Sequence, residues 1–291
     1  MSVFARVCSL VFVAVAMPVI AIAQTQESTP PPPKAEAPAI VVQDPDPDLQ
    51  LVPAEPDFTL ATLPSTLRMP KGKFAFRLTH RFTRPIAEGD FGDFVADFFG
   101  FDSSAKVGFE LRYGLMPGTQ ATVHRTSDRT IQFMGQHQLV GQSDTRGFSL
   151  DAIGAVEGGN NFSEEFGGTI GAVLSRRFGD KGAAYVQPYA VFNSNNDADP
   201  EDDSDNTMML GLGGRWRVGS SRMYFVGEVV PRLAGFTPGV EHASFGFEAR
   251  AGGHLFQFNV SNSLATTFGQ VARSGPRNDW YIGFNLTRKF F

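Results

Sequence analysis

Apolar and polar residues alternate with a period of two along almost the whole chain from Lys71 onward. Between residues 207 and 218, for example, Met208, Leu210 and Leu212 form one row, while Gly211 and Gly213 belong to the opposing one. Alternation of this period is typical of β-strands with one apolar face. The pattern predicts twelve strands, near residues 73–84, 105–116, 119–126, 129–141, 148–157, 169–178, 183–194, 207–218, 222–234, 243–252, 254–263 and 278–290.

The connections between these strands favour a membrane barrel over a soluble sandwich. Most strands have about ten residues, the length that a tilted strand needs to cross a bilayer. Short turns follow every second strand, and longer loops follow the others except at Ser127-Asp128. A soluble β-sandwich would show the same alternation, but it does not explain the two classes of loop. We therefore predict an all-β fold over residues 71–291, an antiparallel transmembrane β-barrel of about twelve strands.

The N-terminus has the features of a secretory signal. Arg6 precedes an apolar run over residues 7–22, and Ala21-Ile22-Ala23 is a small-residue cleavage site, which predicts a signal peptide over residues 1–23. The single cysteine, Cys8, would be lost with it, so that the mature chain would hold no disulfide and no thiolate metal site. We expect export to the periplasm and a final location in the bacterial outer membrane.

Residues 24–70 have the composition of a linker. They contain eleven of the nineteen prolines and seven acidic residues against two basic ones. Such a stretch favours an extended chain that buries no core. We predict a disordered, Pro-rich, acidic periplasmic linker, either a solvated spacer or a docking arm for a periplasmic partner.

The rows that would face the barrel interior carry most of the informative charges. They hold nine basic and four acidic residues: Arg77, Arg81, Lys106, Arg112, Arg177, Arg215, Arg217, Arg232, Arg250, Glu110, Asp151, Glu228 and Glu248. Rings of Arg and Lys favour anions, which predicts a pore for small polar or anionic solutes. A closed lumen joined by ion pairs is the alternative, and it predicts a non-conducting structural or docking barrel. The barrel region is nearly neutral overall and offers no basic field for nucleic acid.

The first long loop contains an unusual segment, residues 89–104, GDFGDFVADFFGFDSS. Its Phe and Asp residues recur at helical spacing on opposite sides, and Asp90 is placed to cap the N-terminus. We predict one short amphipathic helix that folds inward and forms a constriction, with its acidic side against Arg81 and Arg112. Its residues would be Asp90, Phe91, Asp93, Phe94, Asp97, Phe98 and Phe99.

Other candidate chemistry is weak. His242-Ala-Ser244 places a base and a hydroxyl on one strand face, as in some outer-membrane lipid hydrolases, but no orienting acid or amide follows in the expected place. We expect no enzymatic activity and no cofactor. Residues 195–206 hold six acidic residues that suit either a solvated loop or calcium, without the spacing of an EF-hand.

Three stretches carry a resemblance to a known family: LTHRFTRP from Leu78, FFGFDSSAKVGFELRYG from Phe98 and GTQATVHRTSDRTIQF from Gly118. They resemble a family of bacterial β-barrel proteins that is catalogued as a domain of unknown function. The resemblance implies a barrel and an outer-membrane location, with lipid as a partner, and it carries over no catalytic residue. The aromatic C-terminus, ending at Phe290 and Phe291, resembles the signal that the barrel-assembly machinery reads.

Overall fold

A computed structural model describes residues 52–195, 204–275 and 279–291, all within one compact unit. The predicted signal peptide and most of the acidic loop 195–206 lie outside these ranges. The elements in chain order are β1 (Phe74–Pro85), α1 (Phe91–Ala96), η2 (Phe98–Gly100), β2 (Ala105–Met116), β3 (Thr119–Thr126), β4 (Ile131–Val140), β5 (Ser149–Gly158), α2 (Gly159–Phe162), β6 (Glu164–Arg177), β7 (Gly182–Phe192), β8 (Thr207–Arg217), β9 (Met223–Val230), β10 (Arg232–Gly235), β11 (His242–Ala251), β12 (His254–Ser261), α3 (Phe268–Ala272) and β13 (Tyr281–Phe290).

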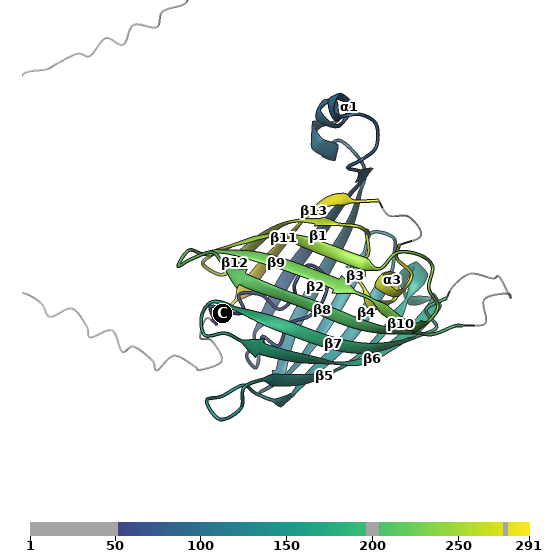
Figure 1. Ribbon diagram of the computed structural model, residues 1–291. Helices are drawn as coiled ribbons and strands as arrows, with labels where there is room; N and C mark the ends of the chain where they lie inside the picture. Colours follow the sequence, from purple (N-terminus) through teal and green to yellow (C-terminus); the bar gives the residue numbers. More distant parts are fainter. Residues whose placement is uncertain (1–51, 196–203, 276–278) are drawn as a thin grey trace, which may run out of the picture. The chain divides into compact units, whose positions relative to one another are not determined.

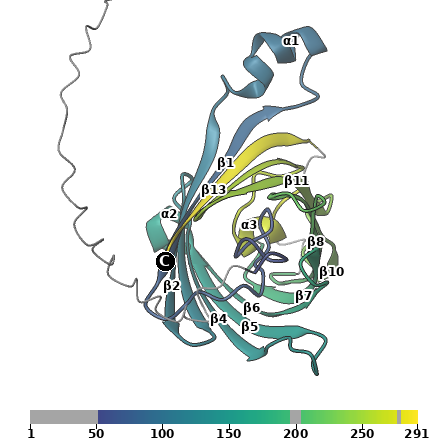
Figure 2. The same ribbon diagram turned by 90° about the vertical axis from the view of Figure 1, so that its left-hand side faces the viewer.

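The strands close into a ring (Figures 1 and 2). Every pairing is antiparallel, β1 pairs with β13, and β8 pairs with β9. β9 and β10 run on from each other and are separated at Pro231, which has no N–H to donate to a sheet. The described residues therefore form a closed antiparallel barrel of twelve crossing strands, which confirms the predicted fold class.

Each strand has one face toward lipid and one toward the lumen. In β2, Phe109, Leu111 and Tyr113 are about half exposed (51, 50 and 46 %), whereas Glu110 and Arg112 between them are 7 and 1 % exposed. The exposed row is apolar and the buried row polar, the reverse of a soluble protein. The rows assigned from the sequence are those that the structure shows.

The two ends of the barrel differ. The connections 117–118, 141–148, 178–181, 218–222 and 252–253 lie at one end, together with the start of β1 and the end of β13; we call it the short-turn end. The long-loop end carries the connections 86–104, 127–130, 159–163 and 236–241, together with the described parts of the connections that follow β7 and β12. The connection after β5 is shorter than predicted because β6 begins at Glu164, earlier than the sequence indicated.

The lumen is not empty. Residues 52–70 enter it from the short-turn end, and α3 lies across it near the long-loop end (Figure 2). Both segments belong to one buried apolar cluster, in which Leu60 and Leu63 share neighbours with Phe268 and Val271. Among the described residues, no helix is long and apolar enough to cross a membrane.

The plugged lumen as candidate functional site

Residues 52–70, which we call the plug, fold back on themselves inside the barrel. The Leu60 amide donates to the Leu63 carbonyl (2.7 Å), and the Ser65 amide donates to the Phe58 carbonyl (2.7 Å), so that the segment forms a hairpin with its tip at residues 60–63. Leu60, Ala61 and Ser65 have no exposed surface. The prediction of a disordered linker is therefore wrong for residues 52–70, while residues 24–51 lie outside the described part of the chain.

Arginines of the wall bind the plug through its main-chain carbonyls. Arg215 donates from Nη1 to the Asp57 carbonyl (2.8 Å) and from Nη2 to the Thr59 carbonyl (2.6 Å). Arg77 donates to the Ala61 carbonyl (2.7 Å). An extended chain rich in proline leaves its carbonyls unpaired, and an unpaired carbonyl is costly to bury. The guanidinium groups satisfy these acceptors, which is the physical reason that a segment of linker composition is ordered here.

Side-chain amides complete this main-chain recognition. Gln257 donates to the Leu60 carbonyl (3.1 Å), and Asn285 donates to the Ala61 carbonyl (3.2 Å). On the returning half of the hairpin, Gln187 donates to the Pro64 carbonyl (3.0 Å) and Gln136 to the Ser65 carbonyl (2.8 Å). Side-chain amides of β4, β7, β12 and β13 therefore bind the main chain of the plug.

Glu228 holds the tip of the plug. Its Oε2 accepts the amides of Ala61 and Leu63, both at 3.1 Å. Its Oε1 lies 3.2 Å from Nε2 of His242, and Nδ1 of His242 lies 2.8 Å from the Ser263 hydroxyl. The plug tip is thus connected, through a carboxylate and an imidazole, to a residue at the long-loop end.

The wall also has room for the side chains of the plug. A Cβ at Gly213 would lie 2.4 Å from Leu60 Cδ1, and one at Gly211 would lie 2.8 Å from Leu63 Cδ1. These two glycines of β8 face the lumen, and no larger residue would fit beside the plug. The ring of Phe58 lies 5.2 Å from the Arg112 guanidinium carbon and 5.1 Å from the Lys289 ammonium, which is cation–π geometry.

The predicted lumen residues all fall in inward rows, but they have different partners. Arg77, Arg81 and Arg215 bind the plug, Glu228 holds its tip, and Arg177 lies 3.7 Å from the plug carboxylate Glu55. Within the wall, Glu110 pairs with Arg112 (3.0 Å), Glu248 pairs with Arg215 (3.2 Å), and Asp151 accepts a hydrogen bond from Gln136. Toward the ends of the barrel, Arg217 binds turn carbonyls, Arg250 lies near the short-turn end, and Lys106 and Arg232 lie near the long-loop end. Five of the nine basic residues that the sequence assigned to a solute path therefore contact the plug: Arg77, Arg81, Arg112, Arg177 and Arg215.

The predicted constriction is wrong in its position. The helix forms as expected, with Asp90 as N-cap and a reciprocal bond from Asp93, but α1 and η2 lie outside the ring of strands (Figures 1 and 2). Asp97 pairs with Arg84 (2.7 Å) rather than with Arg81 or Arg112, because Arg84 is the cation nearest the base of the loop. All seven predicted helix residues except the half-buried Phe94 are exposed. The plug, not this helix, occupies the lumen.

The helix α3 lies across the lumen near the long-loop end (Figure 2), and we call it the cap. The Gly269 amide at the start of α3 donates to Glu157 (3.0 Å), and Arg232 donates to the Ala272 carbonyl at its end (3.0 Å). The space left between the plug and α3 has a volume of about 20 Å³, which holds about one water molecule.

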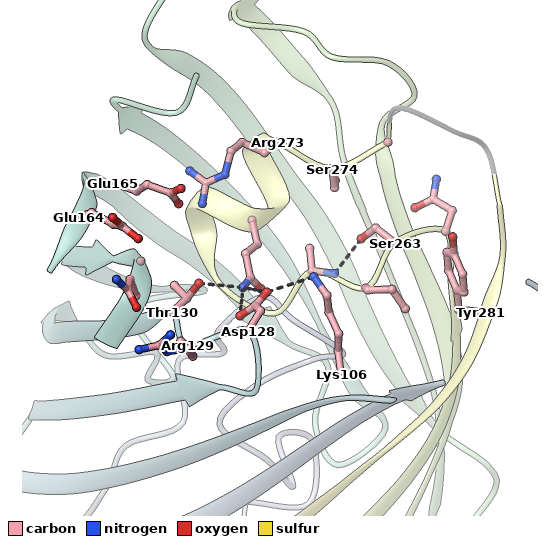
Figure 3. A pocket seen from close by; sticks show the side chains of 17 residues that line it. Lys106, Asp128, Arg129, Thr130, Glu164, Glu165, Ser263, Arg273, Ser274 and Tyr281 are labelled. Atoms are coloured by element: carbon pink, nitrogen blue, oxygen red, sulfur yellow. Dashed lines mark hydrogen bonds and ion pairs between the residues drawn. The ribbon is translucent and has the colours of Figure 1, made fainter. Parts of the chain in front are cut away.

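Above α3 the long-loop end is hollowed into an outer pocket of about 780 Å³ (Figure 3). Its charged lining residues have both signs: Lys106, Asp128, Arg129, Glu164, Glu165 and Arg273. Asp128 accepts from Lys106 (3.0 Å) and from Gln270 of α3 (3.1 Å), which joins the β3–β4 turn to the cap. Burial raises the pKa of the Asp128 carboxyl, but hydrogen bonds from Thr126 and Lys106 outweigh it and hold this pKa below its usual 3.8. No group of three His, Cys, Asp or Glu in the described ranges could hold a metal ion.

The His242-Ser244 pair considered from the sequence is not formed. The Ser244 hydroxyl has no hydrogen-bond partner, and His242 contacts Ser263 of the connection after β12 instead. Sequence reasoning missed Ser263, Lys289 and the plug. One sequence signal for the plug exists, since residues 58–67 form an uncharged stretch within an otherwise charged segment.

Comparison with known proteins agrees with this architecture. The family model described as "Membrane bound beta barrel domain (DUF5777)" matches residues 57–290. The chain belongs to this family. The match includes most of the plug, which therefore belongs to the family's domain rather than to a separate linker. No curated protein sequence matches the chain.

One solved porin structure shares the fold. The NanC porin is similar over 76 % of this chain and 100 % of its own, with a TM-score of 0.51 and 7 % identity. Variants of a porin from Rhodopseudomonas blastica match 64 % of this chain, with a TM-score of 0.33 and 13 % identity. The chain spans only 55 % of that porin's length. The protein is thus a membrane β-barrel with porin-like structural neighbours.

Proposed function

We propose that this protein is an outer-membrane passage for small polar or anionic solutes that its own N-terminal segment closes. After export through the periplasm, the long-loop end would face outward and the short-turn end inward. The plug would then enter the lumen from the periplasmic side. The outer pocket would be the vestibule from which a solute approaches α3.

One observation carries the proposal: the wall arginines bind the plug by its carbonyl oxygens. Carbonyl, carboxylate and phosphate oxygens are all acceptors for guanidinium groups, so that an anionic solute could use the same donors once the plug has moved. Most of the plug's polar contacts are hydrogen bonds to its main chain, which an oxygen-rich solute can replace one at a time. Because basic residues outnumber acidic ones in the lumen-facing rows, even with Lys289 and Glu157 added, the open path would favour anions.

A matched cysteine pair tests whether the plug is the gate. Thr66 Oγ1 of the plug and Ser175 Oγ of β6 are 2.5 Å apart, close to the length of an S–S bond of about 2.05 Å. In protein refolded without residues 1–23, Thr66→Cys with Ser175→Cys would contain the only two cysteines. Single-channel recordings in planar bilayers should show no openings from the oxidised pair. The reduced pair should open as often as the parent chain.

Deletion of residues 52–70 tests the pore itself. The deleted barrel should conduct steadily and prefer anions, and heat-modifiable gel migration would show that it has folded. A folded, silent deletion variant would support the alternative, a non-conducting structural or docking barrel. If deletion prevents folding, equal conductance of the oxidised and reduced cysteine pair would still reject the plug as the gate.

A second candidate function, ester hydrolysis, is suggested by the hydrogen-bonded series of side chains Ser263, His242 and Glu228. A hydroxyl 2.8 Å from an imidazole that contacts a carboxylate at 3.2 Å is the arrangement that activates a serine. Ser263 also lines the outer pocket. We favour a structural role, because Ser263 Oγ also accepts the Ala265 amide and Glu228 already holds two plug amides. Labelling of Ser263 by a fluorophosphonate probe, lost in Ser263→Ala, would overturn this choice.

The partners that we propose follow from location and remain separate from the gate. They are outer-membrane lipid, the barrel-assembly machinery through the aromatic C-terminus, and a periplasmic protein that binds residues 24–51. A partner that pulls on those residues would act directly on the plug, since the chain continues into it.

A further inference from the structure

The β1–β2 loop exposes more aromatic surface than a loop in water should. Phe91 and Phe98 are 78 and 61 % exposed, and Val95 between them is 42 % exposed. Within α1 the spacing of four residues places Phe91 and Val95 on one side, away from Asp93, and Phe98 follows in η2 beyond the end of the helix. We call Phe91, Val95 and Phe98 the apolar edge. A contiguous exposed apolar surface of this kind marks an interaction site.

The apolar edge is held in a fixed direction. Arg84 of β1 pairs with Asp97 (2.7 Å), and its guanidinium carbon lies 5.5 Å from the ring of Phe94. At the start of α1, the Asp90 side chain accepts the Asp93 amide and the Asp93 side chain accepts the Asp90 amide, both at 3.0 Å. The helix therefore satisfies its own polar groups and is attached through its acidic side and Phe94. On the apolar edge Phe98 contacts other rings of the same loop, while Phe91 and Val95 stay exposed.

The edge is continuous with the lipid-facing wall. Phe98 lies 5.6 Å from Phe101, which meets Phe82 of β1 edge-on at 4.7 Å, and Phe82 lies 6.3 Å from Phe284 of β13. Phe82 and Phe284 belong to the outward rows of their strands. A series of rings thus runs from the barrel wall to Phe98, and it reaches α1 through Phe99, which lies 6.1 Å from Phe98 and 5.7 Å from Phe94.

The loop also lies to the side of the barrel rather than over its mouth. Figure 2 looks into the ring of strands, and α1 lies outside that ring, above β1 and β13; Figure 1 shows it displaced in the same direction. The space beside a membrane barrel is occupied by lipid. We propose that the apolar edge inserts into the interface of the outer leaflet and anchors the long-loop end there.

Lipid is the occupant that these contacts favour, and the charges define which kind of binding to expect. A membrane-surface helix usually adds attraction through basic residues on its polar side. Here that side has Asp90, Asp93 and Asp97, so that insertion would depend on apolar area and not on anionic lipid. A second copy of the chain or a protein partner would cover the same edge but would exclude lipid from it.

Single cysteines carrying a nitroxide label test the proposal in the full barrel. The chain has no cysteine beyond Cys8, so that a label at Phe91→Cys or Phe98→Cys is specific in protein refolded from residue 24. Ala96→Cys is the control at an exposed position of the same helix, away from the apolar edge and outside the capping box. Phe109→Cys on the wall supplies the lipid reference and Asp144→Cys in a short turn the water reference. In zwitterionic vesicles, labels at 91 and 98 should match 109, with oxygen access several-fold above that of a water-soluble nickel complex.

The label at 96 should match the water reference at 144, and addition of anionic lipid should not increase the insertion at 91. Labels at 91 and 98 that are as open to nickel as the label at 144 would overturn the proposal. Labels that are shielded from both oxygen and nickel would overturn it too, because they would indicate a protein contact at the edge.

Discussion

The plug and the β1–β2 loop each lie where the composition of the other segment would suggest. The Pro-rich plug looks like a solvated linker and lies inside the barrel, with Leu60 and Ala61 fully buried. The Phe-rich helix looks like a constriction and lies outside the ring, with Phe91 78 % exposed. The difference follows from the groups that each segment leaves available for contacts with its surroundings.

The polar side chains of the lumen wall bind the plug mainly through its unpaired main-chain groups and less through charged side chains. The plug is extended, so that the carbonyls of Asp57, Thr59 and Ala61 remain free for arginine and amide side chains of the wall. A helix pairs these groups internally and presents only its side chains. The exposed apolar side of α1 carries Phe91 and Val95, which satisfy no arginine hydrogen bond and suit lipid.

The largest effect should come from breaking the contact between Arg215 and the plug. Arg215→Met would leave Glu248 buried without its cation and two plug carbonyls without donors, which should lower the free energy of unfolding by about 3–5 kcal/mol. Arg217→Met is the matched control from the same row, because Arg217 binds only the turn carbonyls of Ser220 and Ser221. Urea unfolding in detergent measures both. Equal losses would show that the plug is not what makes Arg215 important.

A smaller effect should follow from filling the space beside the plug tip. Gly213→Val would place side-chain atoms against Leu60, whose Cδ1 lies 2.4 Å from the Cβ position, and overpacking of this kind costs about 1–3 kcal/mol. Amide exchange at residues 60–66 should accelerate while the barrel strands stay protected. Gly154→Val in β5 is the control, since nothing lies within 4 Å of its Cβ position. Unchanged exchange at the tip would mean that the plug is looser than its contacts indicate.

The helix outside the ring should respond independently of the barrel. Asp90→Ala removes the N-cap of α1 and should destabilise that helix by about 1 kcal/mol. Exchange of residues 91–96 should therefore increase several-fold, with no change in the unfolding of the barrel. Asp144→Ala serves as the control for loss of one exposed carboxylate. A shift in barrel stability with Asp90→Ala would show that the loop and the wall fold as one unit.

The strands could be predicted from sequence because lipid and lumen impose opposite demands on alternate residues. In β2, the alternation of Phe109, Leu111 and Tyr113 with Glu110 and Arg112 follows directly from those demands. The helix could be predicted too, since the Asp90 cap and the Phe spacing are local signals. Where each segment packs depends on partners far away in sequence. Gln257 and Asn285 contact the plug across about two hundred residues, and no local pattern around Pro53 or Pro56 indicates them.

The smallest effect concerns α3, the third segment that meets the lumen. Asp128 joins the β3–β4 turn to α3 through Gln270, and its folded pKa lies below the usual 3.8. A carboxyl with a lowered folded pKa stabilises the fold above its unfolded pKa, and that contribution is lost as the pH falls through the folded value. Amide exchange at Phe268–Ala272, corrected for its intrinsic pH dependence, should therefore show less protection at pH 3 than at pH 6. Because Asp128 is partly exposed, the difference should stay below about 1 kcal/mol. Asp128→Asn should remove most of this pH dependence, and an equal pH dependence in both proteins would assign it to another group.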